Sequence, residues 1–180
     1  ACKDWLTNKV DRSVTGRVAR QQCQGEIQLP LSDCGVVALD YTGRSGIATS
    51  IGHAPQVALA DSAKGSVIAV AEALTNIAGA HLKDGLKSVS LSANWMWPCK
   101  NAGEDAALYK AVEACSDFAC ALGINIPTGK DSLSMTQKYG NEKVYAPGTV
   151  IISAAGETAD VRHTVSPVLQ KRKNSELYYI

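Results

Sequence analysis

The sequence lacks an excess of charge of one sign. Its 180 residues contain 18 Lys and Arg against 17 Asp and Glu, which gives a formal net charge of +1 at pH 7. Proteins that hold nucleic acid usually carry a basic excess, and this sequence has none. We therefore expect no nucleic-acid partner, and a phosphate-bearing ligand would have to be held by a few local groups.

Long apolar runs and paired cysteines are also missing. No apolar stretch approaches the roughly 18 residues that a membrane-spanning helix requires, and we recognise no signal peptide. The six cysteines form no CxxC pair and no zinc-ligand spacing with histidine. From these absences we expect a reduced, cytoplasmic protein with no membrane partner.

What is present fits one globular domain. The chain is long enough to bury a sizeable core, and its 46% hydrophobic and 19% charged residues are ordinary for such a domain. We expect the domain over residues 1–160 and a connection toward a following domain over residues 161–180. Because the sequence opens without Met and stops at LYYI, we also expect it to be a piece of a longer polypeptide.

A helix with an apolar face and one polar stripe is predicted over residues 67–80. Apolar side chains recur there at the i, i+3, i+4, i+7 spacing of a core-facing helix. Glu72 and Asn76 interrupt this pattern and lie one turn apart on a common face. Their oxygens can point at one hard cation or at one polar partner. The alternative is that this face is simply exposed to solvent.

The other expected elements alternate in type along the chain. Strands are predicted over residues 34–42, 46–52, 88–94, 124–127 and 147–157, and a second helix over residues 103–122. We expect irregular segments over residues 11–25 and 95–105. This order of strands and helices predicts an α+β fold, a two-layer domain in which one mixed sheet carries both long helices on one face. The uncovered face should meet another domain or a second copy of the chain, so a homodimer is possible.

A second polar concentration, TGKDSLS, occupies residues 128–134, directly after a predicted strand. Gly129 allows backbone N–H groups to approach an anion, and Lys130 can neutralise phosphate charge. The GxxxxGK[ST] spacing of a Walker A loop is absent. The alternative is a hairpin turn with a surface lysine.

Several short sequence motifs, called words below, occur together in one family. They are DRSVTGRVAR, IATSIGHAP, AEALTNI, LSANWM, GEDAALY, IPTGKDSLSM and VIISA. With these words the chain closely resembles the phosphoribosylformylglycinamidine synthase family over residues 3–167. It is similar to the N-terminal, aminoimidazole-ribotide-synthase-like (AIR-synthase-like) domain in the second half of that family's duplicated synthetase core. The resemblance implies an ATP-dependent ligase of purine biosynthesis, which converts formylglycinamide ribonucleotide to its amidine with ammonia from glutamine. Its partners would be the remaining domains of the enzyme, including a glutaminase domain.

The resemblance also implies a site. In this half of the core the family holds an auxiliary nucleotide, ATP or ADP, with Mg²⁺, and a further Asp and Ser come from the following domain. The implied metal ligands are Asp33, Glu72 and Asn76, and the implied nucleotide contacts are Ser32, Lys3 and Lys130. Because the family also accepts Ala at the position of Ser32, the contact implied there is made by the backbone rather than by the hydroxyl. Magnesium accepts such oxygen ligands together with phosphate oxygens and water.

No catalytic residue is expected in this chain, and the isolated chain should be inactive. Asp11 opens the DRSVTG word at a position where a catalytic half would carry histidines. The alternative function is the catalytic ATP-binding domain of a related enzyme, such as AIR synthase, selenophosphate synthetase or thiamine phosphate kinase. The DRSVTG, LSANWM and GKDS words favour the synthase.

Overall fold

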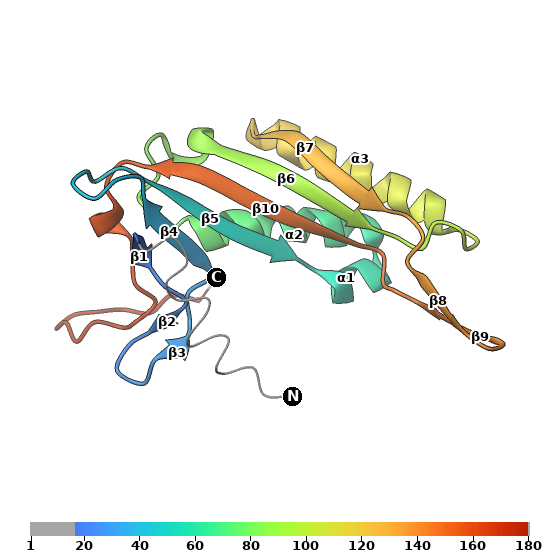
Figure 1. Cartoon of the computed structure of the whole chain (residues 1–180), viewed down its shortest axis with the longest axis horizontal. Coiled ribbons are helices and arrows are strands. Elements are labelled where there is room, and N and C mark those ends of the chain that lie inside the picture. Colours follow the sequence, from blue (N-terminus) through green and yellow to red (C-terminus); the bar gives the residue numbers. More distant parts are fainter. Residues whose placement is uncertain (1–16, 180) are drawn as a thin grey trace.

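The computed structural model describes residues 17–179 and shows a mixed sheet with its helices on one face (Figure 1). The six strands lie in the order β1 (Val18–Arg20), β4 (Cys34–Ala38), β5 (Gly46–His53), β10 (Thr149–Thr158), β6 (Val89–Met96) and β7 (Asn125–Ser132). Neighbouring strands are antiparallel except β6 and β7, which run parallel. The predicted two-layer α+β fold is confirmed.

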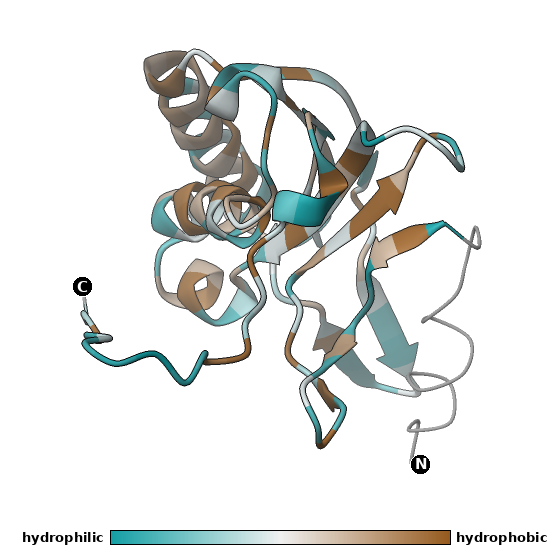
Figure 2. Ribbon diagram, turned by 90° about the vertical axis from the view of Figure 1, so that its left-hand side faces the viewer, coloured by the Kyte–Doolittle hydropathy of each residue, from teal (hydrophilic) through white to brown (hydrophobic). Residues whose placement is uncertain are grey.

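Three α-helices form the second layer: α1 (Pro55–Ala60), α2 (Ser62–Ile77) and α3 (Glu104–Leu122). Figure 2 shows them stacked on one side of the sheet, with α2 next to the strands. Asp61 separates α1 from α2, because its extended backbone ends the first helix and its side chain accepts a hydrogen bond from Lys64 N at the start of the second. Gly123, with a φ of 67°, ends α3 as the sequence predicts.

The core lies between α2 and the central strands. Residues of β5 alternate between buried and exposed along the whole strand, as expected for a strand with one covered face. Gly52 lies where α2 passes closest, because a Cβ there would be 2.2 Å from the backbone oxygen of Ala69. The absence of a side chain at Gly52 therefore lets the helix approach β5 directly.

The opposite face of the sheet is not covered by any helix in the described part of the chain (Figures 1 and 2). Many of its side chains are small or polar, including Thr49 and Ser153. Ile51 is the main apolar exception, with 55% of its surface exposed. This arrangement agrees with the uncovered face expected from the sequence.

Smaller elements complete the structure. Two short hairpins pair β2 (Cys23–Gln24) with β3 (Leu29–Pro30), and β8 (Thr136–Tyr139) with β9 (Glu142–Tyr145). The second hairpin projects from the body of the domain (Figure 1). Within the described residues, 3₁₀ helices span Gly85–Ser88 and Val161–His163. None of the helices in residues 17–179 is long and apolar enough to cross a membrane.

Three local predictions were wrong. Trp95 and Met96, expected in a loop, belong to β6, and the segment 128–132, expected to follow a strand, forms the second half of β7. Parallel pairing with β6 continues as far as Ser132 opposite Met96, so tertiary pairing overrides the polar, turn-like composition. In the expected irregular connector, residues 18–20 and 23–24 form strands paired with β4 and β3, while residues 11–16 lie outside the described part.

Candidate functional site

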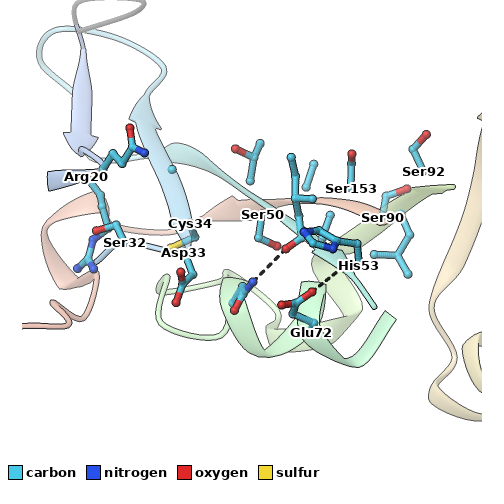
Figure 3. A pocket seen from close by; sticks show the side chains of 18 of the residues that line it. Arg20, Ser32, Asp33, Cys34, Ser50, His53, Glu72, Ser90, Ser92 and Ser153 are labelled. Carbon is cyan, nitrogen blue, oxygen red and sulfur yellow. Dashed lines mark hydrogen bonds between the residues drawn. The ribbon is translucent and has the colours of Figure 1, made fainter. Parts of the chain in front are cut away.

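A cavity of about 880 Å³ lies on the uncovered sheet face and reaches the edge where β4 begins at Cys34, beside α2. Its lining includes four of the residues implied by the sequence, namely Ser32, Asp33, Glu72 and Asn76. Figure 3 shows that the labelled members of this set come from two separate parts of the chain, the segment before β4 and helix α2. Folding therefore brings together residues that are about 40 positions apart in sequence.

Glu72 and Asn76 hold the backbone of β5. Glu72 Oε2 accepts a hydrogen bond from the backbone N–H of His53 at 2.5 Å, and Asn76 Nδ2 donates to the backbone oxygen of Ile51 at 2.9 Å. The pairing of β5 with β4 stops at Ser50, so no strand of residues 17–179 lies beside the next residues of β5 on that edge. Because backbone polar groups need partners, the two α2 side chains replace the missing strand.

This arrangement decides between two interpretations of the polar stripe. Glu72 and Asn76 are half-buried and face the sheet, so the stripe is not a simple solvated surface. Ser50 extends the same contact, because its buried hydroxyl donates to the backbone oxygen of Ala73 at 2.6 Å. The helix is fixed against β5 by polar groups as well as by its apolar side.

The oxygens left over at this edge are suited to a hard cation. Glu72 Oε1 and Asn76 Oδ1 are not used in the bonds to β5. Asp33 is exposed, and its carboxylate makes no hydrogen bond or ion pair with other residues in the range 17–179. In that same range, no three His, Cys, Asp or Glu side chains are grouped so as to hold a metal. A cation here would need ligand or water oxygens as well.

Of the two lysines implied by the resemblance, the structure describes Lys130, and this residue does not line the cavity. Lys130 is exposed on the edge strand β7, and its Nζ donates to Ser132 Oγ at 3.3 Å. Two earlier residues of the same strand, Pro127 and Thr128, do line the cavity, but Lys130 does not. Lys3 lies outside the described residues.

The site also contains residues that the sequence did not point to. Arg20 of β1 is only 8% exposed and lines the cavity, although residues 11–25 read as an irregular connector without periodicity. The hydroxyls of Ser90, Ser92 and Ser153 belong to the uncovered face and line its floor (Figure 3). Alternation with apolar residues in strand 88–94 was the signal that could have found the first two.

Cys34, which follows Asp33, is a packing residue. Burial raises the pKa of its thiol, and this effect is opposed by the nearby Arg20 and reinforced by Asp33. A buried thiol with a raised pKa remains protonated and is a weak nucleophile. We assign it no chemical role in the site.

The fold defines a class of domain that is seen in solved structures. Thermotoga maritima PurL complexed with AMPPCP matches 93% of this chain and 26% of its own chain with a TM-score of 0.69 at 14% identity. The same protein complexed with ADP matches 77% of this chain and 22% of its own with a TM-score of 0.63 at 16% identity. At these identities the comparison shows a shared fold.

The sequence model of one family, described as FGAR-AT PurM_N-like domain, matches residues 2–157. The chain belongs to this family. Human phosphoribosylformylglycinamidine synthase is 49% identical to it over 170 residues, which are 94% of this chain and 13% of the human protein. The chain thus spans a small part of the length of this relative.

Proposed function

We propose that this chain is the part of a phosphoribosylformylglycinamidine synthase that holds an auxiliary nucleotide, ATP or ADP, together with Mg²⁺. The main observation in support is that Asp33, Glu72 and Asn76 line one cavity with oxygens left free for a cation. The 49% identity to the human synthase supports the choice of enzyme. The shared fold of T. maritima PurL complexed with ADP and with ATP supports the choice of ligand.

In this proposal Asp33 is the main anionic ligand, because its carboxylate is exposed and forms no ion pair within residues 17–179. Glu72 contributes Oε1 while its other oxygen keeps the bond to His53, and Asn76 contributes Oδ1 while its nitrogen keeps the bond to Ile51. Bound Mg²⁺ would neutralise charge on the phosphates and fix their geometry. The helix and the strand are thus positioned by the same side chains that face the cation.

Ser32, Lys3 and Lys130 are the proposed nucleotide contacts. Ser32 lines the cavity and is supported by its position. The cavity lining gives no support for Lys130, which would have to act on a part of the ligand outside the cavity.

The complete enzyme would convert formylglycinamide ribonucleotide to its amidine with ATP and glutamine-derived ammonia. Its other domains, including the glutaminase domain, would be the partners of this chain, and one of them, or a second copy of this chain, would cover the open sheet face with its exposed Ile51. A T. maritima structure of the same fold is described as PurLQS. We propose that the isolated chain has no synthetase activity, because the catalytic half and the source of ammonia lie elsewhere.

A Glu72→Gln variant of the complete enzyme tests the proposed site. Glutamine can still accept the hydrogen bond from His53 but lacks the charge that a metal–phosphate site requires. We expect the nucleotide that mass spectrometry finds in the denatured wild-type enzyme to be depleted in the variant, and excess magnesium nucleotide to restore it partly. Turnover per folded molecule should change much less.

Glu113→Gln on the exposed surface of α3 is the matched control, because it removes the same charge far from the cavity. It should retain the nucleotide. If Glu72→Gln retained nucleotide and melting temperature but lost turnover, Glu72 would be catalytic and the auxiliary role would be wrong.

A further inference from the structure

Arg20 is a buried cation beside the site to which the proposed function gives no role. Only 8% of its surface is exposed, yet its guanidinium forms no hydrogen bond or ion pair with any other residue in the range 17–179. A guanidinium remains charged at all physiological pH values. Holding such a charge in a largely buried position without an anion beside it is costly, so the surroundings of Arg20 favour an anionic ligand.

The surroundings of Arg20 open to a ligand. Arg20 lines the main cavity and also a smaller adjoining cavity of about 180 Å³, whose walls include the end of α2 and residues 165–167. Asp33 borders both cavities but makes no ion pair with Arg20. Asp33 therefore does not supply an anionic partner for Arg20.

Ser32 provides a second, independent sign of a missing partner. Its Oγ is buried and has no hydrogen-bond partner among the described residues, and Ser32 lines the same two cavities. Figure 3 shows Arg20 and Ser32 together at the end of the cavity where Asp33 lies. A hydroxyl and a guanidinium can both donate to one oxyanion.

We propose that Arg20 and Ser32 together bind a phosphate group of the nucleotide. This inference rests on the proposed function, which supplies the nucleotide and the cation at Asp33, Glu72 and Asn76. The phosphate chain is then neutralised from two sides, by Mg²⁺ at the edge of β5 and by the guanidinium on β1. The phosphate in turn is the negatively charged partner that Arg20 lacks among the described residues.

An Arg20→Met variant of the full chain tests this role. Methionine retains much of the apolar stem and removes the charge. We expect magnesium ADP and magnesium pyrophosphate to bind about 10- to 100-fold more weakly than to the wild type in titration calorimetry, as for the loss of a hydrogen bond to a charged group. The affinity of Arg20→Lys should lie between those of Arg20→Met and the wild type, because an ammonium group keeps the charge but lacks the planar, forked geometry of a guanidinium. Arg44→Met, an exposed arginine outside both cavities, is the control.

The melting temperature without ligand separates this role from a structural one. If Arg20 is unpaired until phosphate binds, Arg20→Met should melt at the same temperature as the wild type or higher, because an uncompensated buried charge has been removed. A lower melting temperature with unchanged affinity would show that Arg20 supports the fold and would overturn the proposal. Ser32→Ala, which removes only a hydroxyl, should weaken binding without affecting folding.

Other outcomes distinguish this inference from the proposed function. If Arg20→Met binds magnesium ADP as tightly as the wild type while Glu72→Gln does not, the phosphate role of Arg20 fails and the metal site stands. If Arg20→Met loses binding while Glu72→Gln retains it, the metal site fails and the phosphate role stands. If citrate stabilises the wild type, and neither magnesium ADP nor magnesium pyrophosphate does, the bound anion is a carboxylate and the inference is wrong.

Discussion

Substitutions at Glu72 should separate the structural role of its carboxylate from its proposed role toward a metal. In the metal-free chain, Glu72→Ala removes the carboxylate oxygen that accepts the hydrogen bond from the backbone N–H of His53. A hydrogen bond to a charged group contributes about 1.5–3 kcal/mol, and the half-buried position of Glu72 favours the lower end of this range. Glu72→Gln retains a neutral acceptor and should cost about 1 kcal/mol or less.

These free energies correspond to measurable shifts. For a chain of this size, 1 kcal/mol lowers the melting temperature by about 2–4 °C, so we expect a drop of about 3–6 °C for Glu72→Ala and about 2 °C or less for Glu72→Gln. The assay is thermal unfolding by circular dichroism in EDTA, with Glu113→Ala as the control. Amide exchange gives a local readout, because the His53 N–H should exchange faster in Glu72→Ala only. Equal stability of both Glu72 variants and the wild type would refute the idea that α2 replaces a strand beside β5.

Two further predictions concern pH and packing. The Arg162 guanidinium donates a hydrogen bond of 2.6 Å to the buried Asp160 carboxylate and holds the pKa of Asp160 well below its usual range. Because the pKa is lower in the folded state than in the unfolded state, this contact stabilises the fold above about pH 4. The stabilisation is lost as the pH falls toward the folded-state pKa. Urea unfolding between pH 5 and pH 2 should show the stability advantage of wild type over Asp160→Asn shrinking with acidity, and a constant difference would contradict it. Gly52→Ala places a Cβ 2.2 Å from the Ala69 backbone oxygen, so α2 must move. We expect the free energy of unfolding to fall by about 1–3 kcal/mol and the His53 amide to exchange faster. An unchanged free energy of unfolding would mean that the helix has room for a Cβ there.

The sequence could predict the helices and central strands because their signals are local. Apolar spacing marks the helix around Leu74, and alternation marks the strand that ends near Gly52. Glu72 and Asn76 were found for the same reason, since residues four apart share a helix face. Their bonds to β5 depend on β4 beginning opposite Ser50, with Cys34 as its first residue. This register cannot be predicted from the sequence of either segment alone.

Other features were missed because tertiary contacts override local composition. The polar segment 128–132 reads as a turn, but it pairs with β6 along an edge of the sheet. Arg20 lies in a strand of three residues, too short for any periodic pattern, and its burial is produced by residues distant in sequence. A lone arginine in a connector gives no sign that it will be enclosed.

The position of β10 between β5 and β6 has a consequence for synthesis of the chain. β10 is the last strand in sequence, yet it is the only described strand that joins the half carrying β5 to the half carrying β6. On the ribosome both halves are made first and cannot form one sheet until residue 158 has been released. Such long-range pairing slows folding and leaves strand edges open to wrong partners. A nascent chain stopped before residue 149 should therefore remain dependent on chaperones, however complete its helices are.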